Sequence, residues 1–327
     1  MGRRFGSDTL LEVAKETAWG TRAATKTFAL ELMGVSGGFS PGRTPLPVWR
    51  GRTTPGFMDI GQKTLKSYTV PIVYGGNDLL YRALFGGYAF ASLVTPTRYK
   101  HTFTLSTVLP KSITMLDVHS DSGMGGAPTA VSPEMAGCYV RRMQLDFPAA
   151  EVPKVTVDVV GAKETLQSAT SPLAYPAQSE WVIPGQYSCT IDTVSPPADL
   201  NEFSLTIENG MDEGRMKLRT GNSGLGQPDI LDRAKVTGSF SLDYVNVDPF
   251  YTKFISGATF AMVFTITGTG GTQLYTISLP NCVMLGDYPN PSGPGLIQHS
   301  VNFEALAIGA TAPITFEVTN LQSTDLT

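Results

Sequence analysis

The chain has 327 residues, of which 42% are hydrophobic and 16% charged, and its length favours about two domains. Its 24 basic and 28 acidic residues give a net charge of −4, which argues against a surface built to grip DNA or an anionic membrane. The 34 Gly and 23 Pro residues, together with many short alternating segments, predict an all-β fold with many turns.

The N-terminal segment, residues 1–26, is predicted to be an arm outside the folded core. It lacks the apolar region of an export signal, and its residues 8–16 can form a short helix. No later segment approaches the roughly 20 apolar residues that a membrane span needs. Three widely separated cysteines, Cys138, Cys189 and Cys282, fit the buried thiols of a protein made in a reducing cytoplasm.

The first repeating unit begins with a strand at residues 28–32, which a glycine-rich loop follows over residues 33–62. Such long loops are rare unless they have a function. A second strand starts at Lys63 and alternates apolar and polar side chains, with Tyr68 and Val70 on the apolar face. This pattern predicts a strand with one buried face.

A short helix is predicted after this strand. Asn77 and Asp78 are suited to capping its first amides, and Leu80 and Leu84 have helical spacing. Gly86 stands where a residue with positive φ commonly ends a helix.

The rest of the first half reads as strands and connections. Residues 101–119 are predicted to be a hairpin, residues 120–135 a loop without a counterpart later in the chain, and residues 154–162 a strand. The proline-rich residues 168–190 are predicted to be a linker or a strap across the surface. Trp181 in this segment is interpreted as a packing anchor.

The second half repeats this order. It has a strand at residues 203–207, a loop at 209–234 and a second strand that starts at Lys235. A short helix is then predicted to start at Asp248 and Pro249 and to end at Gly257. A hairpin over residues 259–279 and a strand over 297–307 follow. We therefore expect an internal duplication, with β domains at 27–167 and 191–311 and a second arm at 312–327. The alternative is that any two β segments resemble each other this closely.

No catalytic, cofactor or metal residue is predicted. His101, His119 and His299 have no metal-ligand spacing, and we expect His101 and His299 in strands. The glycine-rich residues 268–272 indicate a hairpin turn, and residues 209–214 a solvated turn, although their acidic side chains leave a weak calcium alternative. Ser223 has no neighbouring base, so we expect no nucleophile there.

Several segments in order resemble the major tail tube proteins of long-tailed bacteriophages, in the version with two tube domains per chain. They include ETAWGTRAA at residues 16–24, MAGCYVRRMQLDF at 135–147, KVTVDVVGAKE at 154–164, KVTGSFSLDYVNVDPFYTKF at 235–254 and GLIQHSVNFEALA at 295–307. Each motif is loose by itself, but their order covers nearly the whole chain.

The resemblance implies a non-enzymatic structural protein of the virion tail that uses no cofactor. Its chains would form stacked rings around a pore for double-stranded DNA, with three chains and pseudo-sixfold symmetry in each ring. Tape measure protein in the lumen and tube-end proteins are the other partners implied, without membrane insertion. The long loops and both arms would contact neighbouring rings, and we expect the arms to be dispensable for folding.

Two other classes remain open at this point. A baseplate or capsid-decorating protein can share the same fold. A carbohydrate-binding or glycosidic β-sandwich would need clustered surface aromatics, whereas Trp49, Tyr175 and Trp181 are scattered along the chain.

Overall fold

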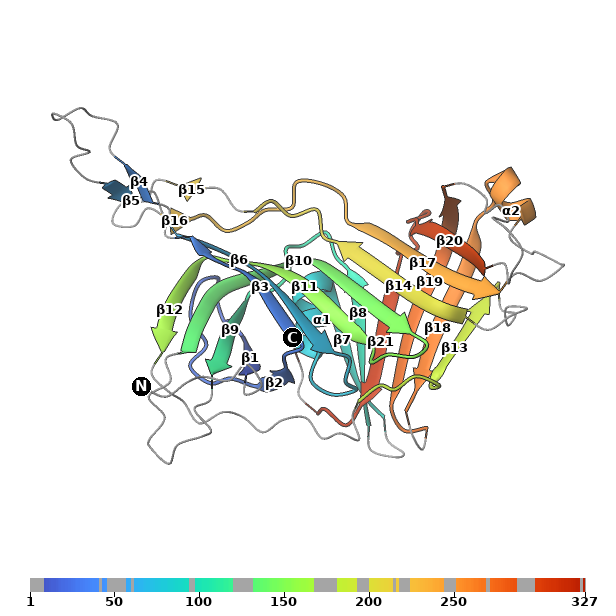
Figure 1. Ribbon diagram of the computed structural model, residues 1–327, viewed down its shortest axis with the longest axis horizontal. Helices are drawn as coiled ribbons and strands as arrows, with labels where there is room; N and C mark the ends of the chain where they lie inside the picture. Colours follow the sequence, from blue (N-terminus) through green and yellow to red (C-terminus); the bar gives the residue numbers. More distant parts are fainter. Residues whose placement is uncertain are drawn as a thin grey trace.

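A computed structural model describes residues 9–40, 43–45, 57–59, 62–93, 98–119, 132–167, 181–192, 200–213, 216–217, 224–243, 251–268, 271–286, 298–323 and 326. It is an all-β fold with two short helices, as expected from the composition (Figure 1). The first half of the chain contains β1 (Thr9–Lys15), β2 (Phe28–Glu31), β3 (Gly34–Ser40), β4 (Arg43–Pro45), β5 (Phe57–Asp59), β6 (Lys63–Pro71), α1 (Asp78–Phe85), β7 (Gly86–Leu93), β8 (Arg98–Leu105), β9 (Ile113–His119), β10 (Ser132–Pro148), β11 (Lys154–Gly161) and β12 (Lys163–Gln167).

The second half contains β13 (Tyr187–Ile191), β14 (Leu200–Glu208), β15 (Met216–Lys217), β16 (Gly224–Leu225), β17 (Lys235–Asp243), α2 (Tyr251–Ser256), β18 (Phe260–Thr267), β19 (Leu274–Leu285), β20 (Gln298–Ala305) and β21 (Thr315–Asn320). The small β4–β5 and β15–β16 pairs lie on the same side of the molecule, and β4 and β5 project beyond the end of β3 (Figure 1).

The other strands form one open antiparallel sheet that bends at two long strands. The last part of β10 pairs with β11 and β14, whereas its first part pairs with β9 and β12. In the same way, the last part of β19 pairs with β20, and its first part pairs with β21. These bends fold the sheet over a continuous buried core that includes residues of both halves.

The order of strand pairing is the same in the two halves. It runs β3, β6, β11, β10, β9, β1 in the first half and β14, β17, β20, β19, β18, β13 in the second. The bends also match, because Cys138 Sγ donates to Met135 O at 3.6 Å and Cys282 Sγ donates to Leu279 O at 3.9 Å. Both thiols are buried and three residues beyond their acceptors.

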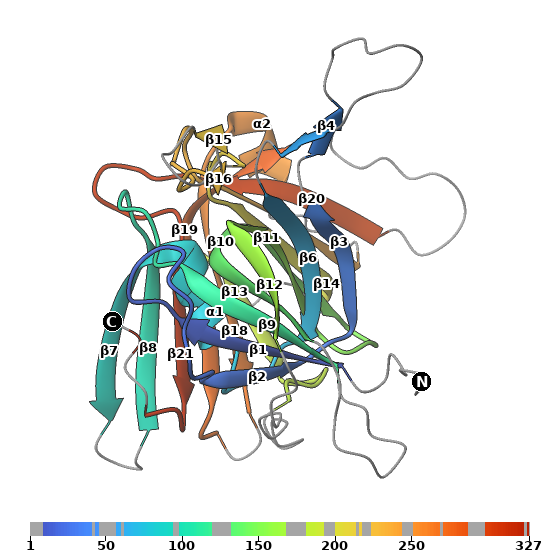
Figure 2. The same cartoon turned by 90° about the vertical axis from the view of Figure 1, so that its left-hand side faces the viewer.

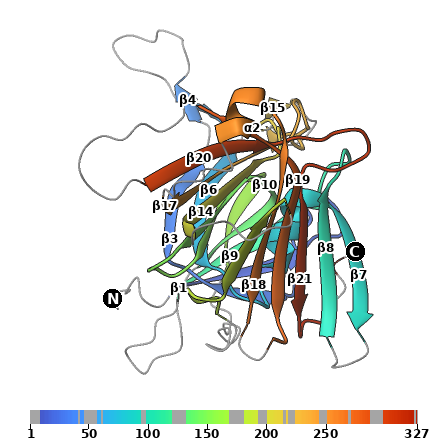
Figure 3. The ribbon, with the colours of Figure 1, turned by 90° about the vertical axis from the view of Figure 1, so that its right-hand side faces the viewer.

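One element breaks this correspondence. The hairpin of β7 and β8 lies between α1 and β9, whereas α2 and β18 are separated only by residues 257–259. β8 pairs with β21, so the first half contributes two strands beside the second half. Figures 2 and 3 show β21, β8 and β7 as neighbouring strands.

The two halves fill equivalent core positions differently. In the first half, Lys66 Nζ lies 2.8 Å from Asp117 Oδ2 and 3.1 Å from Glu164 Oε2, and Tyr68 Oη donates to Asp117 Oδ1 at 2.7 Å. Burial lowers the pKa of Lys66, but the charges of and hydrogen bonds to both carboxylates outweigh it and raise the pKa overall. This ionic network links β6 to β9 and β12 in the first half.

In the second half, the position equivalent to Lys66 is Gly238, since each lies three residues after the start of β6 or β17. A Cβ at Gly238 would lie 2.4 Å from Phe303 Cζ, so an aromatic ring occupies the space that the lysine needs. Phe203, Phe240 and Phe303 pack together there, with ring centroids 6.1 to 6.4 Å apart. The two halves therefore share a strand order but place different residue types at equivalent core positions.

Several sequence expectations are wrong in detail. Residues 9–15 form β1, not a helix, and pair with β2 and β9. The expected loop 33–62 contains β3, which pairs with β6. β8 and β9 do not form the expected hairpin, because β8 pairs with β7 and β21, and β9 pairs with β1 and β10.

The segments expected outside the domains also contain paired strands. Residues 315–320, expected in a C-terminal arm, form β21 between β19 and β8. β13 overlaps the expected linker and pairs with β18. The strand expectations at Lys63 and Lys235 and the hairpin of β18 and β19 are confirmed.

Helix α1 forms where expected, but its first residue is not capped as expected. The side chain of Asn77 makes no capping hydrogen bond, and its Nδ2 donates to Pro71 O at 3.1 Å. Gly86 has the expected positive φ of 77°, and Gly257 after α2 has a φ of 65°. Asp248 and Pro249 lie outside the described residues.

Candidate functional site

The two halves meet along a continuous strand pairing within the chain. Residues 142–148 of β10 pair antiparallel with residues 208–202 of β14. On the core side of this junction, Phe147 lies opposite Phe203, with ring centroids 6.0 Å apart, and Leu145 lies opposite Leu205. The pairing therefore joins β14 of the second half to the last part of β10 of the first half.

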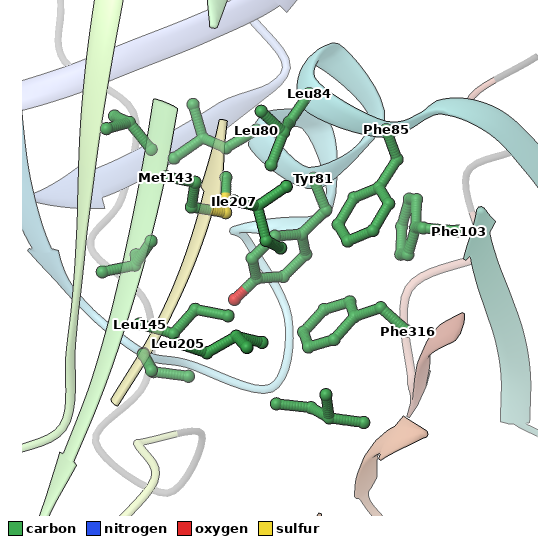
Figure 4. Packing of buried hydrophobic residues seen from close by; sticks show 14 of the residues in the cluster. Leu80, Tyr81, Leu84, Phe85, Phe103, Met143, Leu145, Leu205, Ile207 and Phe316 are labelled. Carbon is green, nitrogen blue, oxygen red and sulfur yellow. The ribbon is translucent and has the colours of Figure 1, made fainter. Parts of the chain in front are cut away.

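Helix α1 packs beneath this junction. Figure 4 shows Leu80 and Leu84 of α1 close to apolar side chains of both strands, which are Met143, Leu145, Leu205 and Ile207. Asn209, which follows β14, donates a buried hydrogen bond from Nδ2 to Leu84 O at 2.8 Å. The expected solvated turn at 209–214 is therefore wrong at its start, because Asn209 is 3% exposed and binds the helix.

Followed through the junction, the pairing order β3, β6, β11, β10, β14, β17, β20, β19 has an unpaired edge at each end. Within the described part of the chain, β3 pairs only with β6, and residues 283–285 of β19 pair only with β20. Every residue of β3 is exposed, including Val35 at 56% and Phe39 at 37%. Leu285, the last residue of β19, is 41% exposed. Unpaired strands with exposed apolar side chains invite pairing with another chain.

Helix α2 lies beside the second edge and differs from α1 in burial. Seven of the eight residues of α1 are buried. In α2, Ile255 is 67% exposed, Phe254 is half-buried, and Thr252 and Ser256 are exposed. α1 is thus covered by a junction of two strands, whereas among the described residues no such junction covers α2.

The face of the sheet opposite the core is polar and carries paired charges. One row of this face crosses four consecutive strands, and its residues are, in order, Asp158, Arg142, Glu208 and Lys235. Negative and positive charges therefore alternate across the junction. Arg142 lies 3.7 Å from Asp158 and 3.6 Å from Glu208. The side chains of Asp158, Arg142 and Glu208 line a shallow depression of about 340 Å³. Two rows further along this face, Lys154 lies opposite Asp146.

The described residues offer little for catalysis. No group of three or more His, Cys, Asp or Glu side chains among them could hold a metal ion. All three cysteines are free, and burial raises the pKa of Cys189 and Cys282 to about 12, which disfavours the nucleophilic thiolate. Cys189 is only half-buried, unlike the other two, so the expectation of three buried thiols holds for two.

The histidines occupy strands. His101 in β8 is buried and lies 2.9 Å from Tyr88 Oη and 3.1 Å from Gln322 O, a structural role. His299 lies in β20, as expected, and His119 ends β9.

The other residues that the sequence singled out either belong to the strand framework or lie outside the described part of the chain. Residues 268–272 connect β18 and β19, which confirms the hairpin turn. Trp181 forms a bridge with Val73, and Val182 N donates to Ile72 O, so this segment is fixed against the first half. Ser223, Trp49 and Tyr175 lie outside the described residues.

The sequence alone did not locate the open strand edges at β3 and at the end of β19. β3 lies within a segment that the sequence predicted to be a loop, and only the alternation of Val35 and Phe39 with small residues indicates a strand there.

Neither helix in the described part of the chain is long and apolar enough to cross a membrane.

Comparison with protein families gives one match. The model of a family described as phage tail tube protein matches residues 6–305. No curated protein matches the chain.

Proposed function

The chain belongs to the phage tail tube protein family, which consists of structural proteins of the virion tail, and we propose that it self-assembles into closed rings. The rings stack into the tail tube, the conduit through which double-stranded DNA passes into the host. The observation that carries this proposal is the pair of open edges at β3 and at the end of β19. They lie at opposite ends of one pairing order, as a head-to-tail contact requires.

The domain division follows from the sequence repeat. Residues 27–167 and 191–311 are two tube domains that arose by duplication, with residues 168–190 as their connection and residues 1–26 and 312–327 as flanking segments. The shared order of strand pairing supports this division. β1, β13 and β21 lie in or overlap the flanking or connecting segments, so each domain depends on them to complete its sheet.

A ring of this chain contains three copies. A closed ring repeats equivalent contacts around its axis. Two similar domains per chain then alternate around the ring and give threefold symmetry close to sixfold. The small pairs β4–β5 and β15–β16 on one side of the molecule are suited to contact the next ring. Tape measure protein in the lumen, proteins at the tube ends and assembly in the host cytoplasm complete the proposal.

Imaging the purified chain tests this function. Size-exclusion chromatography and electron microscopy should find rings or tubes, and a cryo-EM map should contain three copies each of Tyr68 and Phe240 at matching radii. Six copies of Phe240 in one ring would refute the three-chain ring. Single rings that never stack would favour a baseplate or capsid-decorating protein, and a persistent monomer would contradict assembly altogether.

The polar face of the sheet is suited to line the pore. Arg142, Lys154 and Lys235 each lie opposite a carboxylate, so their charges are neutralised locally and are less available to phosphates. Lysine and arginine contacts to phosphate produce salt-dependent affinity, which a conduit must avoid. We expect assembled tubes to bind double-stranded DNA no more tightly than micromolar at low salt.

Removing the neutralising carboxylates should create such affinity. In the variant Asp158→Asn/Glu208→Gln, Arg142 and Lys235 lose their partners, and DNA binding at low salt should become at least tenfold tighter and should weaken as salt rises. A matched control, Glu151→Gln in the exposed turn between β10 and β11, should leave binding unchanged. Submicromolar binding by the native tube would contradict a neutral pore face.

A further inference from the structure

A lysine and two carboxylates meet inside the first half, where water has little access. Lys66 Nζ on β6 lies 2.8 Å from Asp117 Oδ2 on β9 and 3.1 Å from Glu164 Oε2 on β12. The side chains of Lys66 and Asp117 are each 9% exposed, and that of Glu164 is 15% exposed. Keeping charges in such a place has a desolvation cost, which a neutral covalent link between two of the groups would remove.

The second half forms the same strand order without any of these polar groups. Asp117 and Phe264 each lie two residues after a methionine that pairs with Met135 or Leu279, the equivalent acceptors at the two bends. Glu164 and Ile308 each lie three residues after a residue paired with the second residue of β6 or β17. In this way Lys66, Tyr68, Asp117 and Glu164 match Gly238, Phe240, Phe264 and Ile308. The polar group is therefore not a requirement of the fold.

We propose that Lys66 and Asp117 condense into an isopeptide bond, with Glu164 as the proton carrier and Tyr68 as the donor to the developing oxyanion. The new bond joins Lys66 Nζ to Asp117 Cγ, and one water molecule is released. No atom changes its oxidation state, so the step requires no co-reactant. The bond forms within one chain and does not rest on the proposed ring.

The distances place the nucleophile beside its target. Since Lys66 Nζ lies 2.8 Å from Asp117 Oδ2, it is also next to Cγ, the carbon that carries this oxygen. Holding two reacting groups in contact can give an effective concentration of about 10⁵ to 10⁸ M. This proximity, together with the scarcity of water around the group, offsets the poor equilibrium of amide formation in free solution.

The hydrogen bond between the two groups also supplies the reactive protonation states. Burial lowers the pKa of Lys66, but both carboxylates raise it overall, so the ammonium is the resting form. Transfer of one proton from Nζ to Asp117 Oδ2 produces the neutral amine and the neutral acid together. Because this neutral pair is a minor form, we expect the bond to form slowly after the chain has folded.

Tyr68 and Glu164 lie where the next steps need them. When Nζ adds to Cγ, negative charge develops on Asp117 Oδ1, to which Tyr68 Oη donates a hydrogen bond at 2.7 Å. Burial, above all, raises the pKa of Tyr68, which keeps this donor protonated. Glu164 accepts a proton from Nζ and passes it to the Oδ2 hydroxyl, which leaves as water. Glu164 is then again a carboxylate, and the charges of Lys66 and Asp117 are gone.

The bond would connect strands that no ladder connects. In the described part of the chain, β6 pairs with β3 and β11, whereas β9 pairs with β1 and β10. Lys66 and Asp117 are 51 residues apart, and α1 and the β7–β8 hairpin lie in the loop that the bond closes. Such a loop persists after denaturation and makes the unfolded chain more compact.

Intact-mass spectrometry of the denatured chain tests the proposal. The purified chain, incubated until its mass is constant, should be lighter than its sequence by the mass of one water molecule. After digestion with trypsin, residues 64–82 and 112–141 should be recovered as one joined peptide, because trypsin does not cleave after an acylated lysine. A mass equal to that of the sequence, or a water loss that maps to other residues, would overturn the proposal.

Lys66→Arg is the matched control. Its guanidinium keeps a positive charge beside both carboxylates but cannot be deprotonated to attack. The variant should keep the full mass of its sequence, and its denatured chain should migrate more slowly on a gel than the looped native chain. A water loss that persists in Lys66→Arg would overturn the proposal, since it would have to arise elsewhere.

Two further variants separate a chemical role of the neighbours from a structural one. Glu164→Gln keeps the shape of the side chain but cannot carry the proton, and Tyr68→Phe introduces the residue that the second half has at this position. In chains collected at successive times after synthesis, we expect each variant to form the bond at least tenfold more slowly, with an unchanged circular dichroism spectrum. Rates equal to the native rate would overturn the roles assigned to Glu164 and Tyr68.

Discussion

Replacing Glu16 with alanine is expected to lower the free energy of unfolding by about 4 kcal/mol, because buried donors would lose a charged acceptor. Glu16 is 3% exposed. Its Oε1 accepts hydrogen bonds from Thr114 Oγ1 at 2.8 Å and Gly137 N at 2.7 Å. Its Oε2 accepts from Ser112 Oγ at 2.7 Å and Gly20 N at 3.0 Å. The carboxylate thus joins the segment after β1 to the bend in β10.

Urea unfolding followed by circular dichroism measures this effect. Glu16→Gln keeps the size of the side chain but places an amide nitrogen where hydrogen-bond donors converge. We therefore expect it to lower the free energy of unfolding by about 2 kcal/mol. Glu151→Ala, in the exposed turn after β10, should change stability by less than about 0.5 kcal/mol. A loss below about 1 kcal/mol for Glu16→Ala would contradict the role assigned to the carboxylate.

Deleting residues 313–327 is expected to prevent folding of the chain to its native state. β21 lies between β8 and β19, so its loss would leave one edge of each of these strands unpaired and would uncover buried side chains of both halves. Asn320 also donates from Nδ2 to Tyr74 O at 2.7 Å and to Asp78 Oδ2 at 2.8 Å, which fixes the strand to the start of α1. The sequence alone had suggested a dispensable arm.

Point variants keep this prediction testable if the truncated chain is insoluble. Phe316→Ala removes a ring that is 1% exposed and packs 4.6 Å from Tyr81 between ring centroids. It should cost about 4 kcal/mol. Glu317→Ala, next in sequence but paired with Lys100 at the surface, should cost less than about 1 kcal/mol. A truncated chain with a native circular dichroism spectrum and a cooperative unfolding transition would refute the prediction.

The sequence predicted elements whose partners and burial leave a local pattern. β6 and β17 each bury one face, so their alternation was readable, and β18 and β19 are joined by a short glycine-rich turn. β1 was misread because Leu10, Leu11, Val13 and Ala14 are all buried, and a strand buried on both faces has no alternation.

Long-range pairing could not be read from the sequence. β8 pairs with β21, more than 200 residues later, and nothing in either strand specifies the other, since any two strands with an apolar face can pair. The order of the sequence motifs was enough to identify the family. The open edges could be located only from the pairing register of several strands, which the sequence does not give.

The β7–β8 hairpin has a mechanical consequence for a ring of three chains. It bridges from the first half to β21 of the second, so it reinforces the joint inside each chain, but the second half has no such hairpin to reinforce the joint to the next chain. Stiff and compliant joints would then alternate around the wall, with the compliant ones spaced at 120°. A cross-section with threefold symmetry resists bending equally in every direction. A bent tail would therefore flex without a preferred plane, and its strain would concentrate at the seams between chains.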